Sequence, residues 1–129
     1  MQKRELKEDI EKLLKYLPIF QRDDFNPIDE EKCKDSDIPF MLCYTSEVQS
    51  FIDDFYKSDL VYSFDWSKWQ DEAIKYVNNP NLIENVDIQT IQKLLTLHMR
   101  KERFCEGHLI DMIDNGHIVA LLRRLKAIN

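Results

Sequence analysis

The side chains best suited to chemistry in this 129-residue chain are gathered in its last third. All three histidines and both glycines lie between residues 93 and 129, and each glycine directly precedes a histidine, in Gly107-His108 and in Gly116-His117. Imidazole transfers protons near neutral pH and binds metal ions, and glycine adopts backbone conformations that other residues avoid. The clustering predicts where a functional site lies, but it identifies no reaction.

A zinc site is the first chemistry that these residues suggest. His98, Glu102, Cys105 and Glu106 share one face if the preceding helix continues that far, and imidazole, thiolate and carboxylate are zinc ligands. Structural zinc sites usually have two close pairs of ligands, whereas the sequence shows only Cys105-x-x-His108. We therefore expect neither a metal nor a cofactor. His98 is then a hydrogen-bonded core residue and Cys105 a small buried side chain.

Cys105 also suggests nucleophilic catalysis. A cysteine enzyme requires a thiolate of lowered pKa, a base within hydrogen-bond distance and donors for the oxyanion that forms. The three cations at positions 100, 101 and 103 would lower the pKa of the thiol, and His98 or His108 could be the base. The spacing does not fix this geometry, so the sequence leaves open whether the chain is an enzyme.

The basic residues of the same segment suggest an anion site. Arg100 and Arg103 precede a helix that is expected to begin near His117, and the first N–H groups of a helix attract anions. Phosphate, a nucleotide or a nucleic-acid backbone would suit such a site. The alternative is that these cations, with Arg123 and Arg124, form a solvated face or ion pairs. A glycine-rich phosphate loop is excluded, because the chain has only two glycines.

The charge distribution bears on nucleic-acid binding. The net charge is −6, but residues 93–129 contain seven basic and four acidic residues. Residues 88–127 also have the outline of a helix-turn-helix motif, with Arg123, Arg124 and Asn129 on the recognition helix. Many small helical domains end in this way, and an acidic chain is repelled by phosphate. A nucleic-acid partner is therefore possible but not favoured.

The sequence FDWSKW at residues 64–69 gathers three aromatic side chains. Such clusters belong to the core more often than to a ligand platform. Asp65 would cap the following helix or accept from an indole N–H. If the aromatic cluster instead binds a ligand, it would form a stacking pocket beside the histidine segment. Asp65 and Trp66 are therefore included in the candidate site.

Length and composition limit the class of protein. A chain of 129 residues fits one domain whose core needs no disulfide or metal, and scarce glycine and proline disfavour an all-β fold. The three cysteines, Cys33, Cys43 and Cys105, are odd in number and far apart, which indicates free thiols in a reducing compartment. The N-terminus lacks the apolar segment of a signal peptide, and no stretch approaches the roughly 18 apolar residues of a membrane span. We expect a cytoplasmic protein without membrane contact.

Helical periodicity begins near the N-terminus. The first predicted helix carries an apolar stripe from Leu6 to Leu17, and Pro18 ends this helix or lies just past its end. Residues 21–39 follow as an acidic irregular stretch, which is either a mobile loop or a lid. The S-x-x-Q patterns that start at Ser46 and Ser67 are capping boxes, and they predict the next two helices.

The second half of the chain continues in the same way. Residues 60–64 are either extended or a buried connection. Asp87 is the expected N-cap of a helix with Ile91, Leu95 and His98 on one side. Gly116 supplies the left-handed conformation that follows the next helix, and Ile118 opens the apolar face of the last one. With no confident strand, the prediction is an all-α fold of about six helices in a single compact domain.

Three strings in the chain, YTSEVQSFIDDFY, FDWSKWQDEA and KLLTLHMRKERFCEGHLIDMIDNGHIVALLRRL, resemble a family of small bacterial proteins, domain of unknown function 6508. The likeness covers roughly residues 40–127, and residues 1–39 (the N-terminal helix and its acidic loop) fall largely outside it. It implies a bacterial or phage origin but no activity, substrate or cofactor. The positions typical of the family are Asp65, Trp66, His98, Arg100, Arg103, Phe104, Glu106, Gly107, His108, Gly116 and His117.

These observations favour a non-enzymatic interaction or regulatory module in the cytoplasm. Its working face would lie in residues 98–117 together with Asp65 and Trp66, and its possible partner is another protein. The candidate cluster comprises Asp65, Trp66, His98, Arg100, Arg103, Glu106, His108 and His117.

Two alternatives stay open. A small enzyme, or a binder of an anion or metal, predicts that His98, Arg103, Glu106 and His108 converge in one pocket. A helix-turn-helix DNA regulator would use residues 88–127. The ligand, the oligomeric state and the biological process do not follow from the sequence.

Overall fold

Apolar residues at helical spacing organise the part of the chain that the computed structural model describes, which is residues 2–22, 25–29 and 44–129. Within these ranges the structure has seven α-helices, two 3-10 helices and no strand, and one isolated bridge pairs Ile28 with Tyr44. The predicted all-α fold is confirmed. Most of the acidic stretch at 21–39, and the expected free thiols of Cys33 and Cys43, lie outside the described residues.

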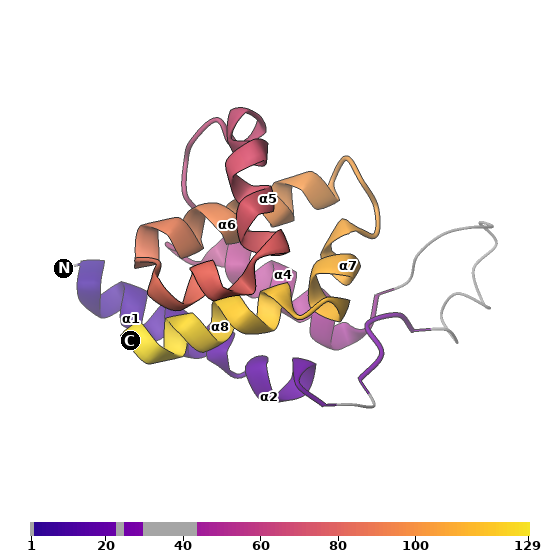
Figure 1. Ribbon diagram of the computed structural model, residues 1–129. Coiled ribbons are helices and arrows are strands. Elements are labelled where there is room, and N and C mark those ends of the chain that lie inside the picture. Colours follow the sequence, from indigo (N-terminus) through magenta and orange to yellow (C-terminus); the bar gives the residue numbers. More distant parts are fainter. Residues whose placement is uncertain (1, 23–24, 30–43) are drawn as a thin grey trace.

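Figure 1 shows the described helices, coloured in chain order from α1 near the N-terminus to α8 at the C-terminus. Their bounds are α1 (Gln2–Leu14), α2 (Leu17–Phe20), α4 (Ser46–Lys57), η1 (Trp66–Trp69), α5 (Gln70–Asn78), η2 (Pro80–Asn85), α6 (Ile88–Glu102), α7 (His108–Asp114) and α8 (His117–Ile128), where η marks a 3-10 helix. The short α2 accounts for the seventh α-helix, where we expected about six.

The end of the first helix differs from the prediction. We expected Leu17 to belong to the first helix, with Pro18 at its end or just past it, but α1 ends at Leu14. Pro18 lies instead in the first turn of α2, where its missing N–H removes no hydrogen bond. Proline therefore starts a new turn here, and Leu17 and Phe20 of that turn are buried.

The two predicted capping boxes are also displaced. The N-cap of α4 is Thr45 rather than Ser46, and its side chain accepts from the amide of Val48 at 3.3 Å. Ser67 lies inside η1, and α5 begins only after it. The side chain of Gln70 donates to the carbonyl of Ser67 instead of bonding a free amide. Threonine caps nearly as well as serine, so the local sequence allows either start.

Helix α6 is central because it contacts α5, α7, α8 and η1. All residues from Leu94 to Met99 are buried, so this part of the helix is covered on every face. Asp87 caps its start as predicted, accepting from the amide of Thr90 at 2.9 Å. The segment at 60–64 is an irregular connection that α6 fixes, since the amide of Tyr62 donates to the buried Thr96 hydroxyl.

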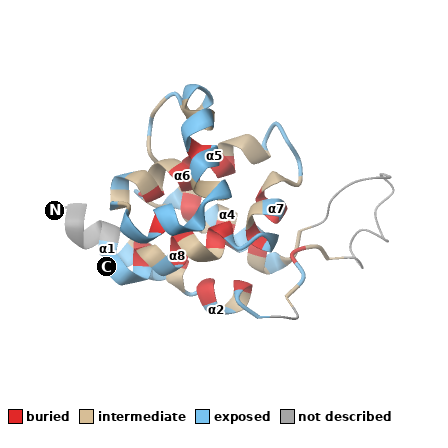
Figure 2. Ribbon diagram, in the orientation of Figure 1, coloured by how far each residue is buried: buried red, intermediate tan, exposed pale blue. Residues whose placement is uncertain are grey.

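Helix α8 joins the two halves of the chain. It has α1 and α2 on one side and α6 on the other (Figure 1). Its apolar face is buried as predicted, and Figure 2 shows the buried residues of α4, α6 and α8 gathered in the interior. Among the described residues, none of the helices combines the length and the apolar composition that crossing a bilayer requires.

Replacing Gly116 by alanine is expected to lower the free energy of unfolding by about 1 kcal/mol. Gly116 has a φ of 86°, and a Cβ atom there would meet nothing within 4 Å. The cost is therefore one of backbone conformation alone. Urea unfolding of Gly116→Ala measures it, and Gly116→Asn should lose less, because asparagine tolerates this conformation better. A loss of 3 kcal/mol or more would contradict the open surroundings.

Candidate functional site

The three histidines meet inside the protein, each from a different helix. α6 supplies His98, and the first residues of α7 and α8 supply His108 and His117. The His98 ring centroid lies 5.1 Å from that of His108 and 4.8 Å from that of His117, whose ring is almost perpendicular to it. The backbone explains this convergence, because Gly107 and Gly116, both at positive φ, turn the chain directly before the two helices.

Burial leaves this histidine cluster poorly supplied with hydrogen bonds. Nδ1 of His98 and Nε2 of His108 lie 2.9 Å apart, so one of these two nitrogens carries the N–H hydrogen of its imidazole and donates it to the other. His98 is only 2% exposed and His117 only 5%. The Nε2 atoms of these two residues are buried without a hydrogen-bond partner. The prediction that His98 is a hydrogen-bonded core residue is confirmed.

The surroundings keep all three imidazoles neutral. Burial is the main cause in each case, because it disfavours the charged form. It holds the pKa of His98 well below its usual range, aided by the neighbouring imidazoles, and lowers the pKa of His117 to about 4. Burial and Lys101 also lower the pKa of His108, although Glu102 and Asp111 oppose them.

A small cavity of about 70 Å³ lies next to this cluster, between α5 and the α6–α7 pair. His98 and His108 line it together with Lys101 and otherwise mainly apolar side chains. The described residues contain no group of three histidine, cysteine or acidic side chains placed to hold a metal ion. The pocket predicted for an enzyme or ligand binder is thus only partly assembled, because Arg103 and Glu106 do not line it.

Glu102 fixes the turn that presents His108. Its Oε1 accepts from the amide of Leu109 at 2.8 Å, and its Oε2 accepts from the amide of Gly107 at 3.2 Å and from the hydroxyl of Tyr44. Burial and the carboxylate of Glu102 raise the pKa of Tyr44. The last residue of α6 therefore caps the start of α7. Nothing in the sequence pattern points to Tyr44, which the sequence analysis missed.

Arg100 and Arg103 turn toward α4. Their guanidinium carbons lie 5.3 Å and 4.9 Å from the ring centroid of Tyr56. Arg103 is exposed, Arg100 is half-buried, and the Tyr56 hydroxyl is buried without a hydrogen-bond partner. The anion site predicted at the start of α8 is not assembled, because His117 is buried there against His98. Tyr56 was not among the residues predicted from the sequence, although the i, i+3 spacing of the arginines places both on one side of the helix end.

The loop after α6 carries an exposed aromatic side chain. Phe104 is 76% exposed, and its ring lies 5.9 Å from that of the half-buried Trp66. This contact joins the FDW segment to the RKERFCEGHL segment. Asp65 caps no helix with its side chain and binds no indole; it accepts from the Ser67 hydroxyl at 2.6 Å and pairs with Lys68.

The candidate residues therefore separate into two groups. The histidines form the buried group, and Trp66, Arg100, Arg103 and Phe104 lie around the end of α6 closer to the surface. Because α6 ends at Glu102, Cys105 and Glu106 leave the helix and are exposed in the loop. The prediction of a buried Cys105 is wrong, and the shared helical face for zinc ligands does not form.

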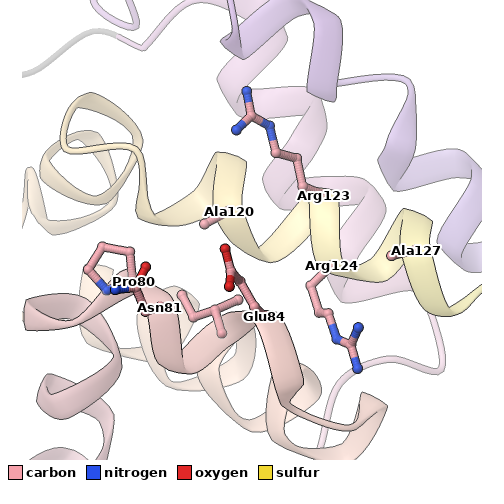
Figure 3. A pocket seen from close by; sticks show the side chains of 8 residues that line it. Pro80, Asn81, Glu84, Ala120, Arg123, Arg124 and Ala127 are labelled. Carbon is pink, nitrogen blue, oxygen red and sulfur yellow. The ribbon is translucent and has the colours of Figure 1, made fainter.

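The basic residues of α8 lie elsewhere. Arg123 and Arg124 line a cavity of about 350 Å³ between α8 and η2. Figure 3 shows their side chains leaving the helix in opposite directions, with Glu84 between them. Arg124 donates to the carbonyl of Val86 at 2.9 Å. The first turn of α8, which would contact DNA in a helix-turn-helix protein, begins with the buried His117 and Ile118. One face of α8 thus packs in the core, whereas Arg123 lies exposed on the other.

Comparison with known proteins gives one match. A family model described as "Family of unknown function (DUF6508)" matches residues 5–129. No curated protein and no solved structure matches the chain. The match confirms the resemblance and extends it, because it includes most of the N-terminal segment at 1–39 that we expected to fall outside.

Proposed function

We propose that this chain, which belongs to the family of unknown function DUF6508, is a protein-interaction module. Its binding face would be the surface of Trp66, Arg100, Arg103 and Phe104, here called the motif face. The observation that carries the proposal is the 76% exposure of Phe104. When a partner covers a large apolar side chain that is exposed to water, the free energy of the complex is lowered.

Three features support this face over other parts of the surface. Phe104 does not belong to the core or to the apolar residues packed against it, so folding alone does not explain its position. Trp66 does pack on the core and gives Phe104 a fixed aromatic neighbour. Aromatic and arginine side chains are also the residues that most often dominate the energy of protein interfaces.

The proposal places the module in a reducing bacterial cytoplasm. The odd number of cysteines and the exposed, free thiol of Cys105 fit such a compartment. The acidic net charge of −6 favours a protein over a nucleic acid as the partner.

Phe104→Ala is expected to abolish retention of a specific partner while leaving the fold intact, because the side chain contributes little to the core. The test is co-purification from extracts of the source organism, followed by reconstitution from purified components. Ile74→Ala is the matched control, since Ile74 is also exposed, at 55%. It should retain the partner as the wild type does.

Circular dichroism should be the same for all three proteins, which excludes unfolding as the cause. Equal retention by Phe104→Ala and the wild type would refute the motif face. Equal loss from both variants would show that retention depends on general surface hydrophobicity instead.

A further inference from the structure

We infer that Arg100 and Arg103, stacked on Tyr56, form an oxyanion-binding site that takes a phosphate or carboxylate group of the partner. The inference rests on the proposed function, because it gives the chemistry of the group that the motif face would bind. It adds an electrostatic contact to the apolar one that Phe104 offers.

The geometry prepares both guanidinium groups for a ligand. Their central carbons lie 5.3 Å and 4.9 Å from one ring centroid, so both cations contact the same side chain. A guanidinium that contacts an aromatic ring keeps its N–H groups free to donate, and their fork matches the oxygens of a carboxylate or phosphate. Tyr56 thereby holds two flexible side chains in place before the ligand arrives, which reduces the entropy lost on binding.

The positive charges at the end of α6 would also be stabilised by a bound anion. Two like charges beside one ring repel each other, and Lys101 adds a third cation to the same turn of α6. Among the described residues, no salt bridge joins Arg100 or Arg103 to an acidic side chain. The carboxylate of Glu102 is already bound by two backbone amides and the Tyr44 hydroxyl.

Tyr56 provides a second, independent sign of an unfilled polar contact. Its hydroxyl oxygen is buried and has no hydrogen-bond partner. A buried hydroxyl without a partner costs free energy, and such groups are few in folded proteins. Among the described residues, the hydroxyl of Tyr56 is therefore unsatisfied and the two cations beside it form no salt bridge.

The neighbouring Phe104 suggests the form of a probe. It follows Arg103 directly in the chain and is highly exposed, so a ligand with an aromatic ring and an anionic group can engage both. Phenyl phosphate and benzoate share this form and differ in the anion. Benzamide has the same shape as benzoate without the charge.

The test is a titration of the full chain with each of the three compounds, followed by NMR of the backbone amides at pH 7 and low salt. Phenyl phosphate or benzoate should shift the amides of residues 100–106 and saturate at millimolar concentration, whereas benzamide should not. The stronger of the two anions identifies the partner group as a phosphate or as a carboxylate. Added salt should weaken the binding.

The variant Arg100→Gln/Arg103→Gln should bind at least ten-fold more weakly than the wild type. Arg123→Gln/Lys126→Gln is the matched control, because both residues are exposed cations on α8, and it should bind as the wild type does. Equal binding by the first variant, or no saturable binding by either anion, would overturn the inference. A protein partner could still be retained through Phe104 after such a result. The retention experiment with Phe104→Ala therefore tests the proposed function separately from this titration.

Discussion

Acidification from pH 7 to pH 4.5 is expected to remove about 2 kcal/mol of the free energy of unfolding through His117 alone. Burial lowers the pKa of His117 to about 4, whereas its usual value is 6.5. The pKa values of His98 and His108 are lowered as well, so both add to the loss. The total is a large part of the roughly 5–15 kcal/mol by which small proteins are stable.

The sign follows from where the protons bind. In the unfolded chain each histidine takes up a proton as the pH falls through about 6.5, but the buried imidazole in the folded protein does not. The stabilisation is therefore complete above that pH and is lost as the pH falls toward the folded pKa. Asp54, Asp65 and Asp87 also have lowered pKa values, but their contributions disappear only below about 4.

Chemical unfolding at a series of pH values between 7.5 and 4.5 measures this dependence. His117→Leu should flatten the curve, because it removes one titrating group and replaces it with an apolar side chain suited to a site that is only 5% exposed. A wild-type curve without slope between pH 6.5 and 4.5 would show that the imidazoles accept protons in the folded state. An unchanged slope in His117→Leu would assign the effect to other groups.

The positions of the helices were largely predictable from the sequence because apolar periodicity is a local signal. Asp87 caps α6 and Gly116 turns the chain after α7, as their residue types indicate. The ends were less predictable where two residues compete for one role. Thr45 caps α4 although Ser46 is equally suited, and Pro18 is compatible both with ending a helix and with opening one.

The part of the sequence that contains the candidate site was predictable, but the positions of its side chains relative to one another were not. The grouping of His98, His108 and His117 in one stretch did indicate that they lie close together. The exposure of Cys105 and Glu106 depends on α6 ending at Glu102, where helical periodicity continues to allow a longer helix. Tyr56 contributes through a contact between distant parts of the chain, and a single sequence carries no signal for such contacts.

Glu102→Ala is expected to lower the free energy of unfolding by about 2 to 3 kcal/mol. The substitution would leave the amides of Gly107 and Leu109 and the hydroxyl of Tyr44 without their shared acceptor. Hydrogen bonds to a charged group are the stronger kind, and the partners left behind are partly buried. The start of α7 should loosen first, because the carboxylate caps that end.

Two further variants separate the parts of this network. Glu102→Gln retains an acceptor oxygen but loses the charge. Tyr44→Phe removes one of the three donors and also a second acceptor of the Gly107 amide, which lies 3.2 Å from the Tyr44 hydroxyl. Each should cost less than Glu102→Ala, because Leu109 keeps its acceptor. Glu84→Ala, at an exposed carboxylate on η2, controls for the loss of a negative charge and should change stability little. Amide hydrogen exchange should be faster at Leu109 in Glu102→Ala and unchanged in the control.

A uniform loss of protection across the protein in Glu102→Ala would show that the carboxylate supports the whole fold rather than the α6–α7 turn. A stability equal to that of Glu84→Ala would show that water replaces the carboxylate without cost. The local outcome has a consequence for the histidines, since the same turn presents His108 to His98. The hydrogen bond between their rings should then weaken together with the turn. Because the carboxylate of Glu102 raises the pKa of His108, its loss in Glu102→Ala should lower that pKa further below its usual value.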